Sequence, residues 1–214
     1  MESKPTPKQK PTPKITDKLL SNYIKSISPV NTGKITVKDE GEPYNMYDKI
    51  TEHVYIGGED GAKNKKFFEK HNIKAVLNCT TDIPNHFSAN KDIEYLRIPV
   101  IDNLTQVQYD KLYKYLPLAV EFIAKHVDLE KNNIYIHCAQ GKSRSCAAAA
   151  AYFITKRNMD PYKACGLILK KRPEAFFYGT SLNFDQCLVK YYNASANASV
   201  STCVRPKIKP SSSK

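Results

Sequence analysis

Ile134-Tyr-Ile-His-Cys-Ala-Gln-Gly-Lys-Ser-Arg-Ser145 joins a β-prone run to a helix-prone one. Residues 134–136 are apolar or aromatic and favour a strand, whereas residues 143–157 contain an alanine-rich run that favours a helix. Residues 138–142 between them are therefore predicted to form a turn. Successive backbone N–H groups converge in such a turn, and the positive end of the following helix also attracts an anion. The stretch therefore predicts a phosphate-binding loop.

Two side chains of this loop indicate its chemistry. Cys138 lies at the bottom of the loop, where N–H groups and the helix dipole stabilise a thiolate, so it is the predicted nucleophile. Arg144 follows six positions later (144 − 138 = 6), and its planar fork can bind two oxygens of a phosphoryl group. Gly141 permits a tight turn, and Ser145 offers a hydroxyl to the sulfur. Taken singly, Cys138 and Arg144 are more often a buried thiol and a surface charge, but together they indicate nucleophilic phosphate chemistry.

The pattern His-Cys-x-x-Gly-x-x-Arg-Ser at residues 137–145 resembles the signature of the cysteine-dependent protein tyrosine phosphatase superfamily, specifically its dual-specificity branch. Small poxvirus-type and atypical members are similar in layout. The resemblance extends from about Tyr47 to Tyr192 and includes the following stretches: Val54–Gly58, Ile73–Cys79, Tyr95–Asp102 and Asn183–Leu188.

The resemblance implies a phosphatase that hydrolyses phosphotyrosine and phosphoserine or phosphothreonine on proteins through a phosphocysteine, without a cofactor or a metal ion. The loop residues expected to bind the substrate are His137, Ala139, Gln140, Gly141, Lys142 and Ser143. His137 is expected to act by orienting the loop through hydrogen bonds.

The departing oxygen needs a proton, which neither a thiolate nor an arginine can supply, so a carboxylic acid is required. Asp102 is the first candidate, because it ends the predicted strand on a loop where the family's general acid sits. Asp110 is the second, although its place inside a predicted helix favours a surface role.

Cys79 is a candidate redox residue. It ends a predicted strand, and ligand sites of α/β sheets lie outside the carboxyl ends of the strands. A thiol beside Cys138 could trap an oxidised nucleophile as a disulfide, as a similar cysteine does in some superfamily members. The alternative is a small buried packing residue.

Alternating strands and helices predict a single α/β domain at residues 46–192, with a central mixed β-sheet flanked by α-helices as in protein tyrosine phosphatases. Residues 1–45 are predicted to be a basic Pro/Lys-rich extension, and residues 193–214 a flexible basic tail. An amphipathic helix at 15–27 could pack on the domain or bind another protein.

The expected elements can be given by range. Extended segments are expected at 47–58 (a short hairpin or a bent strand), 74–79, 93–100 and 134–136, a loop at 82–90, and helices at 62–71, 107–127, 143–157, 161–171 and 182–192.

The 214 residues carry a net charge of +12. Residues 1–45 hold eight basic and five acidic residues (+3), residues 191–214 hold four and none (+4), and the rest hold 21 and 16 (+5). This excess favours phosphoprotein substrates, and a kinase or other acidic partner for the N-terminal segment. Nucleic acid is not favoured, because the tails lack interleaved aromatic residues.

The six cysteines show no paired short spacing for a disulfide framework or a zinc site, and no signal peptide precedes them. We therefore expect a cytoplasmic or nuclear protein that is not secreted. No apolar run is long enough for a transmembrane segment.

Two other classes of function stay open at this point. The same mechanism could act on RNA 5′ ends or on phosphoinositides, which the basic tails and Lys142 favour. A non-catalytic phosphate-binding module is the third reading, although a binding module has no use for a thiolate.

Overall fold

The computed structural model describes residues 15–28, 45–103, 105–176, 184 and 186–201. Its elements follow one another as α1 (Asp17–Ile27), β1 (Tyr47–Lys49), β2 (Val54–Gly57), α2 (Glu59–Ala62), α3 (Lys65–Lys70), β3 (Ile73–Asn78), β4 (Glu94–Arg97), α4 (Gln106–Ala124), the π-helix η1 (Lys125–Leu129), β5 (Asn133–His137), α5 (Arg144–Lys156), α6 (Pro161–Lys171) and α7 (Gln186–Ser201).

The strands form one five-stranded sheet in the order β1-β2-β5-β3-β4. The hairpin β1–β2 is antiparallel, whereas the β2–β5, β5–β3 and β3–β4 pairs are parallel, so the predicted mixed sheet is confirmed. β5 lies at the centre, and Ile136 pairs with Ile56 on one side and Leu77 on the other. Its continuous apolar run follows from this position, because a central parallel strand is covered on both faces.

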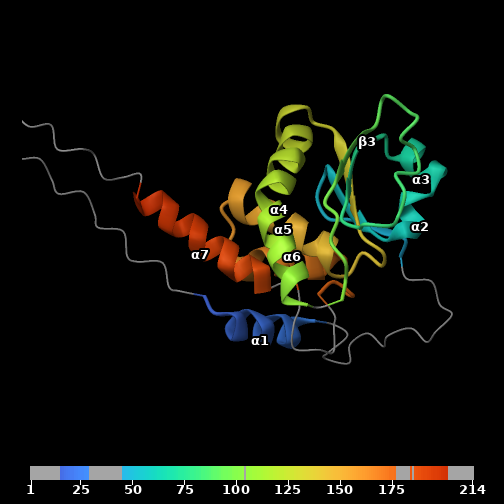
Figure 1. Cartoon of the computed structure of the whole chain (residues 1–214). Coiled ribbons are helices and arrows are strands. Elements are labelled where there is room, and N and C mark those ends of the chain that lie inside the picture. The colour runs from blue at the N-terminus through green and yellow to red at the C-terminus, as the bar shows by residue number, and fades with distance from the viewer. Residues whose placement is uncertain (1–14, 29–44, 104, 177–183, 185, 202–214) are drawn as a thin grey trace, which may run out of the picture.

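Helices cover both faces of the sheet. Figure 1 shows α4, α5, α6 and α7 on one side and α2 and α3 on the other. The first side holds the larger, mainly aliphatic core, and the second holds an aromatic cluster around Phe67, Phe68 and Tyr135. Within the larger layer α5 packs against α4, α6 and α7, and its alanines 147–151 are fully buried. Small side chains there let the surrounding elements approach α5 closely.

The strand expected at 93–100 is shorter than predicted and ends at Arg97. Ile98 still donates its N–H to Asn78 O at 2.9 Å, but Pro99 has no N–H to continue a ladder, and Val100 N–H turns back to Ile98 O.

The helix expected at 62–71 is likewise interrupted. Asn64 accepts a hydrogen bond from Phe67 N–H and so begins α3 separately from α2.

The helix expected at 107–127 is present as α4, which contains Pro117, and continues as the π-helix η1. α7 continues to Ser201, so the predicted start of a flexible tail at residue 193 is wrong. Asn193 Nδ2 donates to Ile15 O at 3.1 Å, which ties this part of α7 to the segment ahead of α1. The other parts of the predicted extension and tail, residues 1–14, 29–44 and 202–214, lie outside the described ranges.

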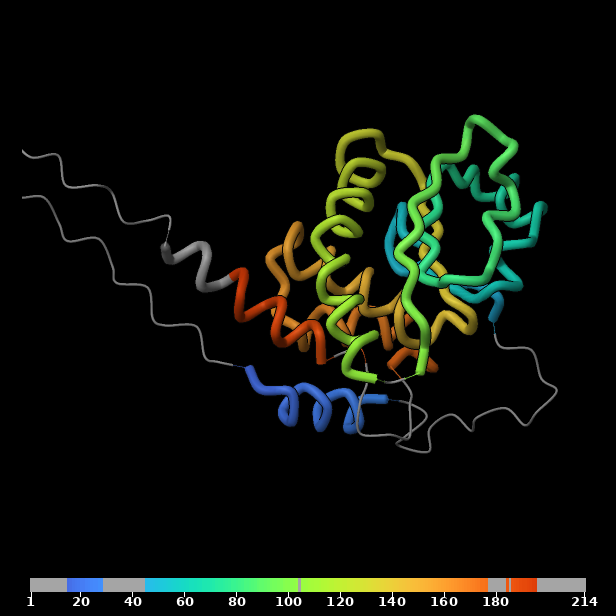
Figure 2. Tube along the Cα trace, viewed as in Figure 1, coloured from blue at the N-terminus to red at the C-terminus, as the bar shows by residue number. Residues whose placement is uncertain are grey.

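The predicted amphipathic helix is α1, and it packs on the domain. Thr16 caps its first turn through Leu19 N–H, and Leu20 and Ile24 are buried. Tyr23 contacts Tyr162 of α6 edge to face, with ring centroids 5.0 Å apart. In the tube view α1 runs beside the helical layer (Figure 2), which agrees with its contacts to α6 and α7.

Within the described ranges, none of the helices has the length and apolar character that crossing a membrane requires.

The packing of α1 predicts unequal effects at two adjacent leucines. Leu20 is fully buried, whereas Leu19 is 53% exposed on the same helix. Leu20→Ala should lower the free energy of unfolding by about 2–5 kcal/mol, because it removes buried methyl groups and leaves a cavity. Leu19→Ala should change it by less than about 0.5 kcal/mol, the usual range for a surface substitution. Urea unfolding of both variants measures the difference, and equal effects would contradict the docking of α1.

Candidate active site

The phosphate-binding loop predicted from the sequence connects β5 directly to α5. Gly141 adopts a φ of 70°, and a Cβ atom at this position would lie 2.3 Å from the carbonyl carbon of Gly57. Both the positive φ and the close approach require glycine. Gly57 ends β2 beside the loop, Gly58 caps α2, and Glu59 N–H donates to Ala139 O at 2.9 Å. The start of α2 therefore packs against the loop.

The carbonyl groups of the loop are bound by partners on its outer side. Their donors are Glu59 N–H for Ala139 O, the Arg172 side chain for Gln140 O and Gly141 O, Phe176 N–H for Lys142 O, and Ala147 N–H for Ser143 O. A peptide whose carbonyl points outward presents its N–H on the opposite side. The loop is thereby organised to offer N–H groups to an anion at its centre.

Cys138 is only 2% exposed and lies at the start of the loop. Its Sγ is 3.4 Å from Ser145 Oγ. Burial alone would raise the pKa of Cys138, but the Arg144 guanidinium, the Ser145 hydroxyl and the backbone N–H groups of Ser145 and Ser143 outweigh it, so the pKa is lowered. The side chain predicted as nucleophile therefore has the environment that a reactive thiolate needs.

Arg144 begins α5 and reaches the segment after β4. Its Nε is 3.2 Å from Asp102 Oδ2, and its Nη1 donates to Val100 O at 2.9 Å. The guanidinium is almost fully buried, whereas the Asp102 side chain is 15% exposed. This contact brings Asp102 to the loop although 36 positions (138 − 102 = 36) separate it from Cys138.

Asp110 has a different environment from Asp102. It accepts a hydrogen bond from Gln106 Nε2 at 3.2 Å, and its Oδ1 is 3.6 Å from Lys190 Nζ of α7. The Asp110 side chain is half-exposed in this pair on the surface of α4 and α7. Of the two carboxylates considered from the sequence, Asp102 is the one that contacts the arginine of the loop.

The remaining loop residues differ in exposure. Ala139 and Gln140 are exposed, Lys142 is partly exposed, and Ser143 is buried. His137 is buried behind the loop, with its ring stacked on Tyr135 and its carbonyl accepting from Cys79 N–H at 2.8 Å. Burial lowers the pKa of His137 to about 4, so its ring is neutral at pH 7. This location agrees with a role in orienting the loop.

Cys79 follows β3 directly, and the last register pair of β3 and β5 is Asn78 with His137. Cys79 and Cys138 are therefore the first residues after two adjacent parallel strands. Burial, and to a lesser extent Cys138, raise the pKa of Cys79 well above its ordinary value, although Arg144 opposes this effect. Cys79 is thus a protonated thiol beside the nucleophile.

Several residues that organise the site carry no signal in the sequence alone. Asn78 Nδ2 donates to Ile83 O and Asn85 Oδ1, and the Arg97 guanidinium donates to Thr80 O and Ile83 O. These bonds shape the segment that follows Cys79. Arg172, which holds the loop, lies 31 positions after Gly141 and is brought to it only by the packing of α6.

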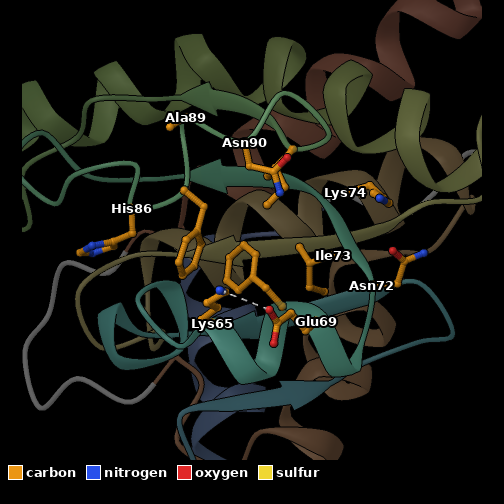
Figure 3. A pocket seen from close by; sticks show the side chains of 11 residues that line it. Lys65, Glu69, Asn72, Ile73, Lys74, His86, Ala89 and Asn90 are labelled. Atoms are coloured by element: carbon orange, nitrogen blue, oxygen red, sulfur yellow. Dashed lines mark ion pairs between the residues drawn. The ribbon is translucent and has the colours of Figure 1, made fainter.

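A separate pocket of about 470 Å³ lies along α3 (Figure 3). All of its lining residues fall between Lys65 and Ile93, so none belongs to the loop. The view shows Lys65 and Glu69 of α3 joined as an ion pair on one side, with His86 and Asn90 on the other. In the part of the chain that the structure describes, no group of three or more His, Cys, Asp or Glu side chains is placed to hold a metal ion.

Comparisons with known proteins indicate the fold and the family of this chain. The human dual specificity protein phosphatase 9 is 30% identical over 144 residues, which are 65% of this chain and 36% of that protein. The crystal structure of human DUSP28 superposes with a TM-score of 0.63 at 20% identity, over 73% of this chain and 99% of that one. The structure of PTPMT1 in complex with PI(5)P has a TM-score of 0.56 at 21% identity, over 73% and 99% of the two chains.

The chain spans about a third of the length of the curated relatives it matches. The family model described as "Dual specificity phosphatase, catalytic domain" matches residues 54–194, which include β2, the loop and most of α7. Because this match covers well over half of the chain, the chain belongs to the dual specificity phosphatase catalytic domain family.

Proposed function

We propose that this protein hydrolyses phosphotyrosine and phosphoserine or phosphothreonine residues of other proteins, through a covalent phosphocysteine. The observation that carries the proposal is the arrangement around Arg144, which joins the loop of the buried, low-pKa Cys138 to Asp102. A module that only binds phosphate needs the loop and the arginine, but it needs neither a thiolate nor an adjacent carboxylate.

In the first step the Cys138 thiolate attacks phosphorus and the bond to the substrate oxygen breaks. The loop N–H groups and the Arg144 fork stabilise the charge on the equatorial oxygens. To do so Arg144 turns part of its fork toward the phosphoryl group, while Val100 O continues to orient it. Asp102, in its protonated form, delivers a proton to the departing oxygen.

In the second step water attacks the phosphocysteine, the phosphorus–sulfur bond breaks, and inorganic phosphate leaves. Asp102, now ionised, accepts the proton of the water. Ser145, whose Oγ is 3.4 Å from the sulfur, donates a hydrogen bond to the thiolate as it departs. Cys138 and Asp102 therefore each act in both halves of the reaction.

Substrate choice, partners and location are further parts of the proposal. The phosphoinositide alternative is supported by the structural similarity of this chain to PTPMT1, whose structure was solved in complex with PI(5)P. This similarity is one of fold. A kinase or other acidic partner remains a proposal for the basic N-terminal segment, most of which lies outside the described residues. The five described cysteines are free thiols, which supports our proposal of a reducing location, the cytoplasm or the nucleus.

Turnover of substrates from three classes, phosphopeptides, a phosphoinositide and an RNA end, tests the activity and the substrate class together. The wild-type protein should hydrolyse phosphotyrosine and phosphothreonine peptides faster than a phosphoinositide or a triphosphorylated RNA end. Cys138→Ser should lose all of these activities, because a serine hydroxyl stays protonated in the loop and is a poor nucleophile there. Residual activity above roughly a few per cent of wild type would contradict the assigned nucleophile. Faster turnover of the lipid or the RNA would replace the proposed substrate class.

Asp102→Ala should slow a phosphoserine peptide by about 10²–10⁴-fold, the usual contribution of a positioned general acid. An activated aryl phosphate, whose leaving group needs no proton, should slow much less. Asp110→Ala is the matched control, since it removes a carboxylate from the surface pair with Lys190. Steady-state rates on both substrates give the contrast. Equal slowing on both substrates, or the contrast in the Asp110 variant, would show that the general acid is misassigned.

Cys79 is proposed to protect the nucleophile from peroxide. Peroxide converts the Cys138 thiolate to a sulfenic acid, and the Cys79 thiol then attacks this sulfur, which forms a disulfide and releases water. Wild type should therefore regain activity with a reductant, and peptide mapping should find the 79–138 link. Cys79→Ser should proceed to the sulfinic acid and recover poorly, whereas Cys146→Ser, which removes another fully buried thiol, should behave as wild type. Equal recovery of the Cys79 variant would leave Cys79 a packing residue.

A further inference from the structure

Arg172 lies directly behind the loop at the end of α6 and is 1% exposed. Its Nε donates to Gly141 O at 2.7 Å, and its Nη2 donates to Gln140 O at 3.0 Å. A single guanidinium thus binds two consecutive carbonyl groups at the turn of the loop. Four residues further on, Phe176 N–H donates to Lys142 O at 2.7 Å after the intervening turn closes with Ala175 N–H on Arg172 O. Residues 172–176 together hold three consecutive carbonyls.

The other edge of the guanidinium is anchored to a distant part of the chain. Nη1 donates to Asp48 Oδ2 at 2.6 Å and to Asn45 O at 3.2 Å, and Nη2 is 3.1 Å from Glu174 Oε1. Arg172 therefore connects the strand β1, the loop and the segment after α6. Its position is determined independently on both edges of the fork.

A buried cation of this kind is costly unless it is paired. Burial tends to lower the pKa of Arg172, but Glu174, Cys146 and Asp48 together raise it above its ordinary value. Both carboxylates are themselves largely buried. The guanidinium therefore stays charged behind the loop, and each of its bonds to a loop carbonyl is charge-assisted.

A loop carbonyl that turned inward would direct its negative end at the phosphoryl oxygens and withdraw an N–H from them. The packing of Gly57 against Gly141 positions the loop backbone. Among the described residues, no backbone N–H donates a hydrogen bond to Gln140 O or Gly141 O. Cys146 Sγ also lies 3.3 Å from Gly141 O, although a thiol is a weak donor. The strong donors to both carbonyls come from Arg172.

We propose that Arg172 is a positioning residue for the reaction of Cys138: by binding Gln140 O and Gly141 O it keeps the loop N–H groups directed at the phosphoryl group. The inference rests on the proposed function. It also explains why this position holds an arginine. A lysine retains the charge, but its compact ammonium group cannot bind two loop carbonyls and Asp48 with the geometry of a planar fork.

Arg172→Lys and Arg157→Lys form a matched pair for the test. Arg157 is the C-cap residue of α5 and pairs with Asp128 while 44% exposed, so its substitution changes an arginine–aspartate ion pair without touching the loop. Three measurements apply to each folded variant: the pH dependence of Cys138 alkylation by iodoacetamide, inhibition by inorganic phosphate, and kcat and KM for an aryl phosphate. Alkylation and phosphate inhibition report on the loop whatever the natural substrate is.

For Arg172→Lys we expect alkylation of Cys138 to require a higher pH, weaker inhibition by phosphate, and a loss of about 10²-fold in kcat/KM, as for a displaced catalytic group. Arg157→Lys should resemble wild type in all three measurements. A folded Arg172→Lys protein with unchanged alkylation and phosphate inhibition would overturn the proposal, whether or not its turnover falls.

Asp48→Asn provides a second variant if Arg172→Lys does not fold. It keeps an acceptor for Nη1 but removes the charge that anchors the outer edge of the fork. For this variant we expect smaller changes of the same kind in Cys138 alkylation, phosphate inhibition and kcat/KM. If none of them is found, the proposal is overturned. Failure of the proposed function is recognised separately, as substantial activity in Cys138→Ser or as faster turnover of the lipid or the RNA by the wild-type protein.

Discussion

An ionised sulfur in a nearly closed site must be compensated by the surrounding protein, because burial by itself favours the neutral thiol. At Cys138 the compensation comes from backbone N–H groups, the Ser145 hydroxyl and the Arg144 guanidinium. The fold positions each of these groups. The N–H groups point at the sulfur because the loop carbonyls are bound on the outer side. The first turn of α5 positions the hydroxyl, and the segment after β4 binds the guanidinium. Much of the architecture therefore serves to stabilise the negative charge of the Cys138 thiolate.

This requirement accounts for the location of the site in the sheet. β5 is central, so its carboxyl end is surrounded by β2 and β3, whose own ends supply Gly57 and Cys79. The helix that follows is also central in its layer. Both sides of the loop are consequently held by elements that pair with β5 or pack against α5. This packing keeps the N–H groups aligned before the substrate arrives. Electrostatic catalysis is effective under this condition, because donors that are already oriented need no reorganisation in the transition state.

The local parts of this arrangement could be predicted from the sequence, and the long-range parts could not. Cys138, Gly141, Arg144 and Ser145 lie within eight positions, and a strand–turn–helix pattern is sufficient to place them together. Asp102 was located through its position after a strand, although that strand proved shorter because Pro99 cannot continue the ladder. Arg172 and Asp48 gave no signal, because a buried ion pair between segments 124 positions apart depends on the packing of α6 and β1. The end of α7 was missed because polar residues can be helical when tertiary contacts hold them, as Asn193 is held by Ile15.

The burial of α5 on all sides has a consequence for how this chain can change over generations. At the five alanines, residues 147–151, the helix has no outward face on which a larger side chain could be accommodated. Any added methyl group there must displace the sheet or a neighbouring helix, and α5 begins with Arg144. Neutral drift at these positions is therefore confined to a very narrow range of side-chain volumes. Substitutions on exposed faces of the domain meet no such limit from packing, whereas residues 147–151 are restricted to small side chains.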